Sequence, residues 1–119
     1  MDASKMKIIE LKNIIEKELN YNFISELSVD EYRKFIYNFF KILSSYKEQG
    51  IKKEDIEDFI NKLYTSESSH FKGNIIGEDM FSFITEEIVN FCPSPFFWNI
   101  SLEEYMQKWE KIYFPSLSQ

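Results

Sequence analysis

Cys92 and His70 are the residues whose chemistry could support nucleophilic catalysis, and they are the only cysteine and the only histidine of the chain. Such catalysis needs the nucleophile beside a base that a third group orients. His70 falls in a predicted loop and Cys92 at a predicted helix end, so nothing in the sequence requires them to meet. A lone cysteine among Phe91, Pro93 and Phe96 is typical of a small buried apolar side chain. We therefore expect that the protein is not an enzyme.

The chain lacks a set of residues that could bind a metal ion or a cofactor. One cysteine and one histidine cannot supply the three or four ligands of a Cys/His zinc site. The acidic residues lack the alternating spacing, glycine and distal glutamate of a calcium loop, and the chain has no glycine-rich loop for phosphate. We expect neither a metal ion nor a cofactor.

Carboxylates are abundant and often adjacent, as in Glu54-Asp55, Glu57-Asp58, Glu78-Asp79, Glu86-Glu87 and Glu103-Glu104. Neighbours on a helix diverge by about 100°, so no such pair forms the facing carboxyls of an acid–base site on its own. First-turn positions in predicted helices explain Glu78-Asp79 and Glu103-Glu104. Glu87 differs because it falls within the apolar arc of its helix. It either lies at the rim of the core, which is the interpretation we favour, or meets a buried partner.

The best candidate for a functional surface is one face of a helix predicted from about residue 53 to residue 64. At about 100° per residue, this face groups four polar side chains opposite the apolar ones: Glu54, Glu57, Asp58 and Asn61. Glu54 and Asp58 repel each other across one helical turn. Lys62, four residues after Asp58, offsets the negative charge of Asp58. No basic residue offsets the charges of Glu54 and Glu57 as directly. The face therefore either meets positive charge on a partner or is an ordinary solvated face.

The next segment, 65–77, reads TSESSHFKGNIIG and predicts the longest loop of the chain. Long loops in small domains are often functional. The loop contains Glu67 and His70 and leads to Glu78 and Asp79. We expect these four residues to belong to the partner-binding surface.

An aromatic run, Phe96-Phe97-Trp98, follows a turn that contains two prolines. A proline-flanked turn cannot easily bury three large rings in a row. The rings either plug the gap between the last two helices or leave Phe97 and Trp98 exposed as anchors for a partner. We include both residues among the candidate partner-binding residues.

Five helical segments position these side chains, at about 4–19, 28–50, 53–64, 78–91 and 101–115, and no strand pattern is of equal strength. Ser28 and Ser101 each begin a predicted capping box. The fourth segment has apolar residues around most of its circumference, up to Phe91, and should be the most buried. The last segment directs Ile112 inward, among other apolar residues, and Pro115 ends it before a short tail. The sequence predicts an all-α, single-domain bundle of about five helices over residues 1–119.

The charge is unevenly distributed along the chain, which has 20 acids, 14 bases and a net charge of −6. Residues 1–53 hold ten bases and eight acids, whereas residues 54–119 hold four bases and twelve acids. The balance argues against a nucleic-acid binder, and the acidic second half would attract a cationic partner. No apolar run is long enough for a membrane span, and acids interrupt the apolar pattern at the start. We expect a soluble cytoplasmic protein that binds neither nucleic acid nor a membrane.

A small, acidic, mostly helical chain of this kind resembles the immunity proteins of bacterial toxin systems, of the contact-dependent growth inhibition and colicin types. Residues 28–91 are similar to the layout of the colicin DNase immunity proteins: a capped helix, an acidic second helix, a serine-rich loop and a further helix. The tyrosine pair and proline of that family are missing near Ile75-Ile76-Gly77, so no family residue is transferred to this chain. The resemblance implies tight binding to a cognate, basic, nuclease-type toxin domain, at its active site or beside it.

Two alternatives remain open at this point. A non-enzymatic helical adaptor or regulatory module could bind a larger protein assembly through the aromatic run at Phe97 and Trp98. An inhibitor could also imitate nucleic acid, because spaced carboxylates resemble phosphates. The sequence leaves the oligomeric state undetermined.

Overall fold

A computed structural model describes residues 3–117, and these residues form helices and loops without a strand. The helices are α1 Ala3–Glu18, α2 Tyr21–Ile24, α3 Val29–Glu48, α4 Lys53–Ser68, α5 Ile75–Ile88, the 3₁₀ turn η1 Phe97–Asn99, α6 Leu102–Lys108, the π turn η2 Trp109–Tyr113 and α7 Phe114–Leu117. The predicted all-α, single-domain bundle is confirmed. Part of the predicted tail, residues 118–119, lies outside the described residues.

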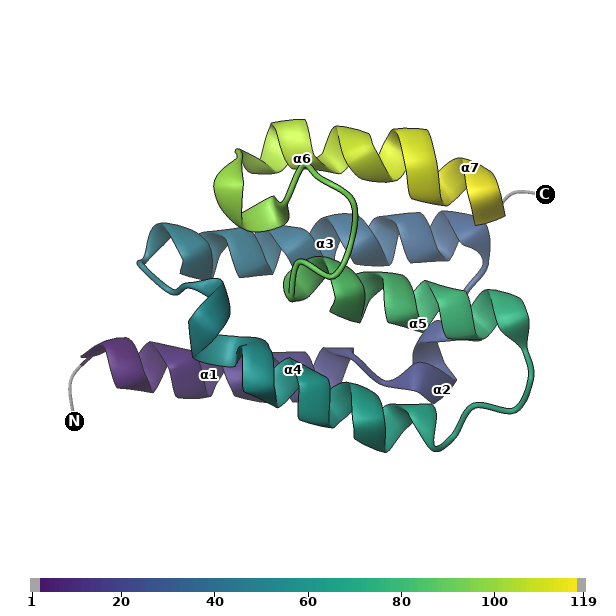
Figure 1. Cartoon of the computed structure of the whole chain (residues 1–119), viewed down its shortest axis with the longest axis horizontal. Coiled ribbons are helices and arrows are strands. Elements are labelled where there is room, and N and C mark those ends of the chain that lie inside the picture. The colour runs from purple at the N-terminus through teal and green to yellow at the C-terminus, as the bar shows by residue number, and fades with distance from the viewer. Residues whose placement is uncertain (1–2, 118–119) are drawn as a thin grey trace.

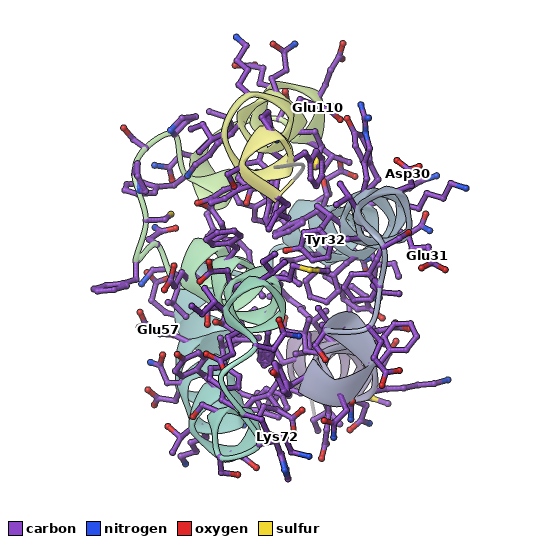
Figure 2. All side chains as sticks on the ribbon, turned by 90° about the vertical axis from the view of Figure 1, so that its right-hand side faces the viewer. Asp30, Glu31, Tyr32, Glu57, Lys72 and Glu110 are labelled. Atoms are coloured by element: carbon purple, nitrogen blue, oxygen red, sulfur yellow. The ribbon has the colours of Figure 1, made fainter. Side chains whose placement is uncertain are left out.

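The helices form three layers, as Figure 1 shows: α1 and α4 lie at the bottom, α3 and α5 in the middle, and α6 and α7 at the top. Helix α3 contacts α1, α6 and α7, while α5 contacts α2 and α4. The hydroxyl of Tyr32 on α3 donates to the carbonyl of Met80 on α5, at 2.6 Å, in the interior between the helices (Figure 2). In the middle layer, α3 from the first half of the chain is therefore hydrogen-bonded to α5 from the acidic second half.

The predicted capping box at the start of α3 is present. Ser28 Oγ accepts a hydrogen bond from the Glu31 N–H at 3.1 Å, and the Glu31 carboxylate accepts one from the Ser28 N–H at 2.9 Å. At the start of α6, Ser101 Oγ accepts from the Glu104 N–H at 3.2 Å. Both serines thus satisfy amides that the first helical turn leaves without intrahelical partners.

The capping box gives a testable dependence of stability on pH. Hydrogen bonding to Ser28, chiefly from its backbone N–H, lowers the pKa of Glu31. The ionised carboxylate therefore stabilises the fold above the ordinary glutamate pKa of about 4.3, and this contribution is lost as the pH falls through the lower folded-state value. We expect Glu31→Gln to be less stable than the parent at pH 7, with the difference disappearing in acid. Urea unfolding of both proteins at pH 7 and in acid measures the difference in stability. An equal difference under the two conditions would contradict the prediction.

The helix boundaries differ from prediction around the 65–77 segment. Helix α4 continues to Ser68, and α5 begins at Ile75 because Asn74 caps it, its Oδ1 accepting from the Gly77 N–H at 3.2 Å. Gly77 is required there, since a Cβ atom would lie 2.7 Å from the Ser25 Cβ next to α2. The predicted long loop is therefore a short turn. Helix α2 was not predicted because four residues are too few for a periodic signal.

The C-terminal layer also differs from prediction. Pro115 does not end the last helix but lies within α7, Phe114–Leu117. The π turn before it lets the Phe114 N–H donate to the carbonyl of Trp109, five residues earlier. This altered register leaves Ile112 about half exposed, whereas the sequence predicted it to face inward.

Candidate functional site

The predicted polar face of α4 is present at the surface. Glu54, Asp58 and Asn61 are exposed, and Glu57 is partly exposed. Figure 2 shows Glu57 on the outer side of α4, across the molecule from the acids at the start of α3. Lys53 Nζ pairs with the Glu57 carboxylate at 2.8 Å. The prediction that nothing relieves Glu57 directly is therefore wrong. The expected relief of Asp58 by Lys62 is also not seen, because no ion pair joins these two described residues. The unpaired carboxylates of this α4 face are those of Glu54 and Asp58.

Helix α5 extends this face, because α4 and α5 pack side by side in opposite directions (Figure 1). Between them lies an open pocket of about 200 Å³. It is lined by Asn61, Tyr64, Thr85, Glu86, Val89 and Phe91. We define the α4–α5 face as Glu54, Glu57, Asp58 and Asn61 of α4 together with Glu86 and Phe91. Sequence reasoning missed the last two, because only the antiparallel packing brings them beside Asn61.

Phe91 is the most exposed of the large apolar side chains in the described residues, at 76% exposure. The prediction that it belongs to a buried helix is wrong, because α5 ends at Ile88. Asn90 adopts a left-handed backbone, with φ at 63°. The N–H groups of Phe91 and Asn90 donate to the carbonyls of Glu86 and Glu87 at 2.9 and 3.5 Å. This Schellman arrangement fixes the backbone that carries the exposed ring. Asn90 before Phe91 was the available sequence signal.

Glu86 forms part of the lining of the same pocket. No hydrogen bond or ion pair reaches its carboxylate from the rest of residues 3–117. Burial, followed by the negative charges of Asp79 and Glu87, raises the pKa of Glu86. A carboxylate in this position gains from any cation that enters the pocket.

The other predicted acidic sites lie at the opposite end of α4 and α5. Helix α4 has 16 residues and is therefore about 24 Å long. Glu67 Oε1 accepts from the Tyr21 N–H at 2.7 Å, and Glu78 Oε2 accepts from the Gly73 N–H at 2.7 Å. These two carboxylates fix the start of α2 and the turn before α5. His70 and Asp79 are exposed near them, so the structure does not bring these four residues together with Glu54.

The aromatic run buries its middle ring, Phe97, and leaves Phe96 and Trp98 partly exposed. Phe97 is fully buried and packs on Phe40 and Tyr105, with ring centroids 5.3 and 5.1 Å away. Trp98 is partly buried, and its Nε1 donates to the Ile88 carbonyl at 2.7 Å. Of the two interpretations, the plug is correct for Phe97. A buried ring cannot contact a partner, so Phe97 is removed from the candidate partner-binding residues.

Glu87 is fully buried and ion-paired, so its predicted position at the rim is wrong. Lys108 Nζ, also buried, lies 2.7 Å from Glu87 Oε2. The hydroxyls of Tyr105 and Tyr113 donate to the same carboxylate. Lys108 also donates to the carbonyl of Pro93 and, at 3.1 Å, to that of Pro95, two residues of the segment after α5. This buried ion pair therefore holds the segment after α5 against α6.

Cys92 does not meet His70, because the two lie beyond opposite ends of α5, whose 14 residues span about 21 Å. Burial and the charge of Glu87 raise the pKa of Cys92 to about 11. A thiol with this pKa holds about two orders of magnitude less reactive thiolate near neutral pH than a free cysteine.

The thiol gives a second prediction. We expect a thiol-specific reagent at pH 7 to label Cys92 in the folded protein about 100-fold more slowly than in the same chain unfolded in urea, because burial disfavours the thiolate. Stopped-flow absorbance with a disulfide reagent measures both rates. Equal rates would contradict the protonated, partly buried thiol.

Comparisons with protein-family models, curated proteins and solved structures gave no match to this chain. In the part of the chain that the structure describes, no helix combines the length and apolarity needed to cross a membrane. In those same residues, no three His, Cys, Asp or Glu side chains converge as metal ligands would. The geometry of the α4–α5 face is therefore the basis for assigning a function.

Proposed function

We propose that this protein is a non-enzymatic immunity protein that binds and neutralises a cognate, basic, nuclease-type bacterial toxin domain through its α4–α5 face. The observation that carries the proposal is the exposed, backbone-fixed ring of Phe91 beside the unpaired carboxylates of that face. Binding interfaces commonly centre on an aromatic anchor with polar and charged groups around it. The bacterial toxin as partner follows from the resemblance of this small, acidic, helical chain to immunity proteins.

Charge and anchor have separate parts in this proposal. Glu54, Asp58 and Glu86 attract a basic surface over several ångströms and accelerate encounter, since complementary charge mainly raises association rates. Phe91 then buries a large apolar surface, which slows dissociation. The adaptor alternative used Phe97 and Trp98 as exposed anchors, and the burial of Phe97 removes one of these two anchors.

The proposal is tested by co-expressing the chain with the product of the neighbouring toxin-like gene and purifying the pair through one tag at about 150 mM salt. We expect a complex in which the nuclease activity of the partner is suppressed. If no complex survives purification, the proposal fails.

A charge-reversal experiment tests the role of the face. We expect the double variant Glu54→Lys, Asp58→Lys to associate about 10-fold more slowly with the partner at low salt, because two attractive charges become repulsive, and the difference should shrink at high salt. The matched control reverses Glu16 and Glu26, two exposed acids outside α4 and α5, and changes the net charge equally. Association rates from surface plasmon resonance measure the effect. Equal slowing in both variants would show that only net charge matters.

A further inference from the structure

We propose that the pocket between α4 and α5 receives a single arginine side chain of the partner, with Glu86 accepting from the guanidinium and the rings of Tyr64 and Phe91 enclosing it. This inference rests on the proposed function, because it names the partner group that the same face recognises.

The size of the pocket favours one side chain over a small-molecule ligand. Its volume is about 200 Å³, below the roughly 300–1,000 Å³ of pockets that enclose drug-sized ligands. The pocket is open to solvent, as docking of a side chain from another protein surface requires. Val89 contributes an apolar wall for the methylene stem of a long side chain.

The lining favours a cation with a flat, weakly hydrated head. Tyr64 and Phe91 line the pocket, and aromatic faces attract cations. Guanidinium is planar, stacks on rings and donates to a carboxylate through two parallel hydrogen bonds, whereas the ammonium of lysine is a strongly hydrated point charge. The lining therefore discriminates in favour of arginine.

Charge within the chain leaves Glu86 without a cation of its own. Asp79 and Glu87 both raise its pKa, in addition to burial. Lys108 pairs with the neighbouring Glu87 and not with Glu86. The Asn61 side-chain amide also lines the pocket, and its oxygen can accept a further guanidinium N–H. An arginine from outside the chain supplies the missing positive charge and fills these acceptors.

The test uses arginine amide as the probe, titrated into ¹⁵N-labelled protein and followed by NMR. We expect saturable shifts at the amides of Asn61, Thr85 and Val89. Lysine amide should bind more weakly, and citrulline amide, which replaces the guanidinium by a neutral urea group, should give no saturable shifts. Glu86→Gln should weaken arginine amide binding about 10-fold, because a charged hydrogen-bond acceptor is lost. Glu103→Gln, which alters an exposed acid of α6, is the matched control and should bind like the parent.

Absence of saturable shifts, equal binding of citrulline amide, or unchanged affinity in Glu86→Gln would each overturn the inference. The outcomes separate it from the proposed function. If arginine amide occupies the pocket but no complex with the neighbouring gene product forms, the inference stands and the proposed function fails. If the complex forms and Glu86→Gln binds the partner like the parent protein, the proposed function stands and the inference fails.

Discussion

Replacing Lys108 by methionine is expected to lower the free energy of unfolding by about 3–5 kcal/mol, because it leaves the Glu87 carboxylate charged and buried without its cation. Lys108 and Glu87 are only 4% and 0% exposed, so water cannot replace the lost partner. The carbonyls of Pro93 and Pro95 also lose their donor. A loss of this size is a large fraction of the total stability of a small domain. Urea unfolding monitored by circular dichroism measures it.

Two further variants make this prediction specific. Lys111→Met removes an exposed lysine three residues further along the chain and should change stability by no more than about 0.5 kcal/mol. Adding Glu87→Gln to Lys108→Met should cost less than the sum of the two single changes, by about 1–3 kcal/mol, because the two charges interact directly. Equal losses for Lys108→Met and Lys111→Met would show that the buried pair does not stabilise the fold.

Replacing Phe91 by serine is expected to weaken binding of the basic partner about 30-fold or more, which corresponds to the roughly 2 kcal/mol of an interface hot spot. The folded protein should be almost unaffected, since the ring is 76% exposed and its loss creates no cavity. The combination is diagnostic, because a buried phenylalanine would lose stability as well. Isothermal titration calorimetry and urea unfolding of the same preparation measure the two quantities.

Phe23→Ser is the matched control for Phe91. Phe23 of α2 is 53% exposed. Its ring packs on Phe35 of α3, and it is not among the residues that line the α4–α5 pocket. Its replacement should leave partner affinity within about twofold of the parent value, a difference below about 0.5 kcal/mol. Comparable losses of affinity in both variants would mean that the partner does not use the α4–α5 face as its anchor.

The helices that the sequence predicts well are those whose signals are local. The 3.6-residue pattern of α3 and the capping box at Ser28 and Glu31 involve residues within one or two turns of each other. The polar face of α4 likewise follows from the spacing of Glu54, Asp58 and Asn61 alone. No tertiary information is needed to place these residues on one side of a helix.

The features that the sequence could not predict depend on contacts between distant segments. Periodicity directs Glu87 inward, but its partner Lys108 is 21 residues away, in a different layer. The pocket beside Asn61 exists only because α5 returns antiparallel to α4. Phe91 lies in the apolar pattern of α5, and only the left-handed Asn90 turns it outward. Rules for helix faces apply up to the last helical residue, and Phe91, the proposed anchor, lies three residues beyond the end of α5 at Ile88.

The π turn at Trp109–Tyr113 makes the C-terminal layer tolerant of a change in chain length. Deleting one residue from an α-helix rotates every later side chain by about 100°. In the π turn, the Phe114 N–H already reaches back five residues to the carbonyl of Trp109, and the half-exposed Ile112 lies between them. A chain without Ile112 would place these two groups at ordinary α-helical spacing, with Phe114 still facing the core. We therefore expect the layer above α3 to tolerate the loss of Ile112 while the α4–α5 face keeps its shape.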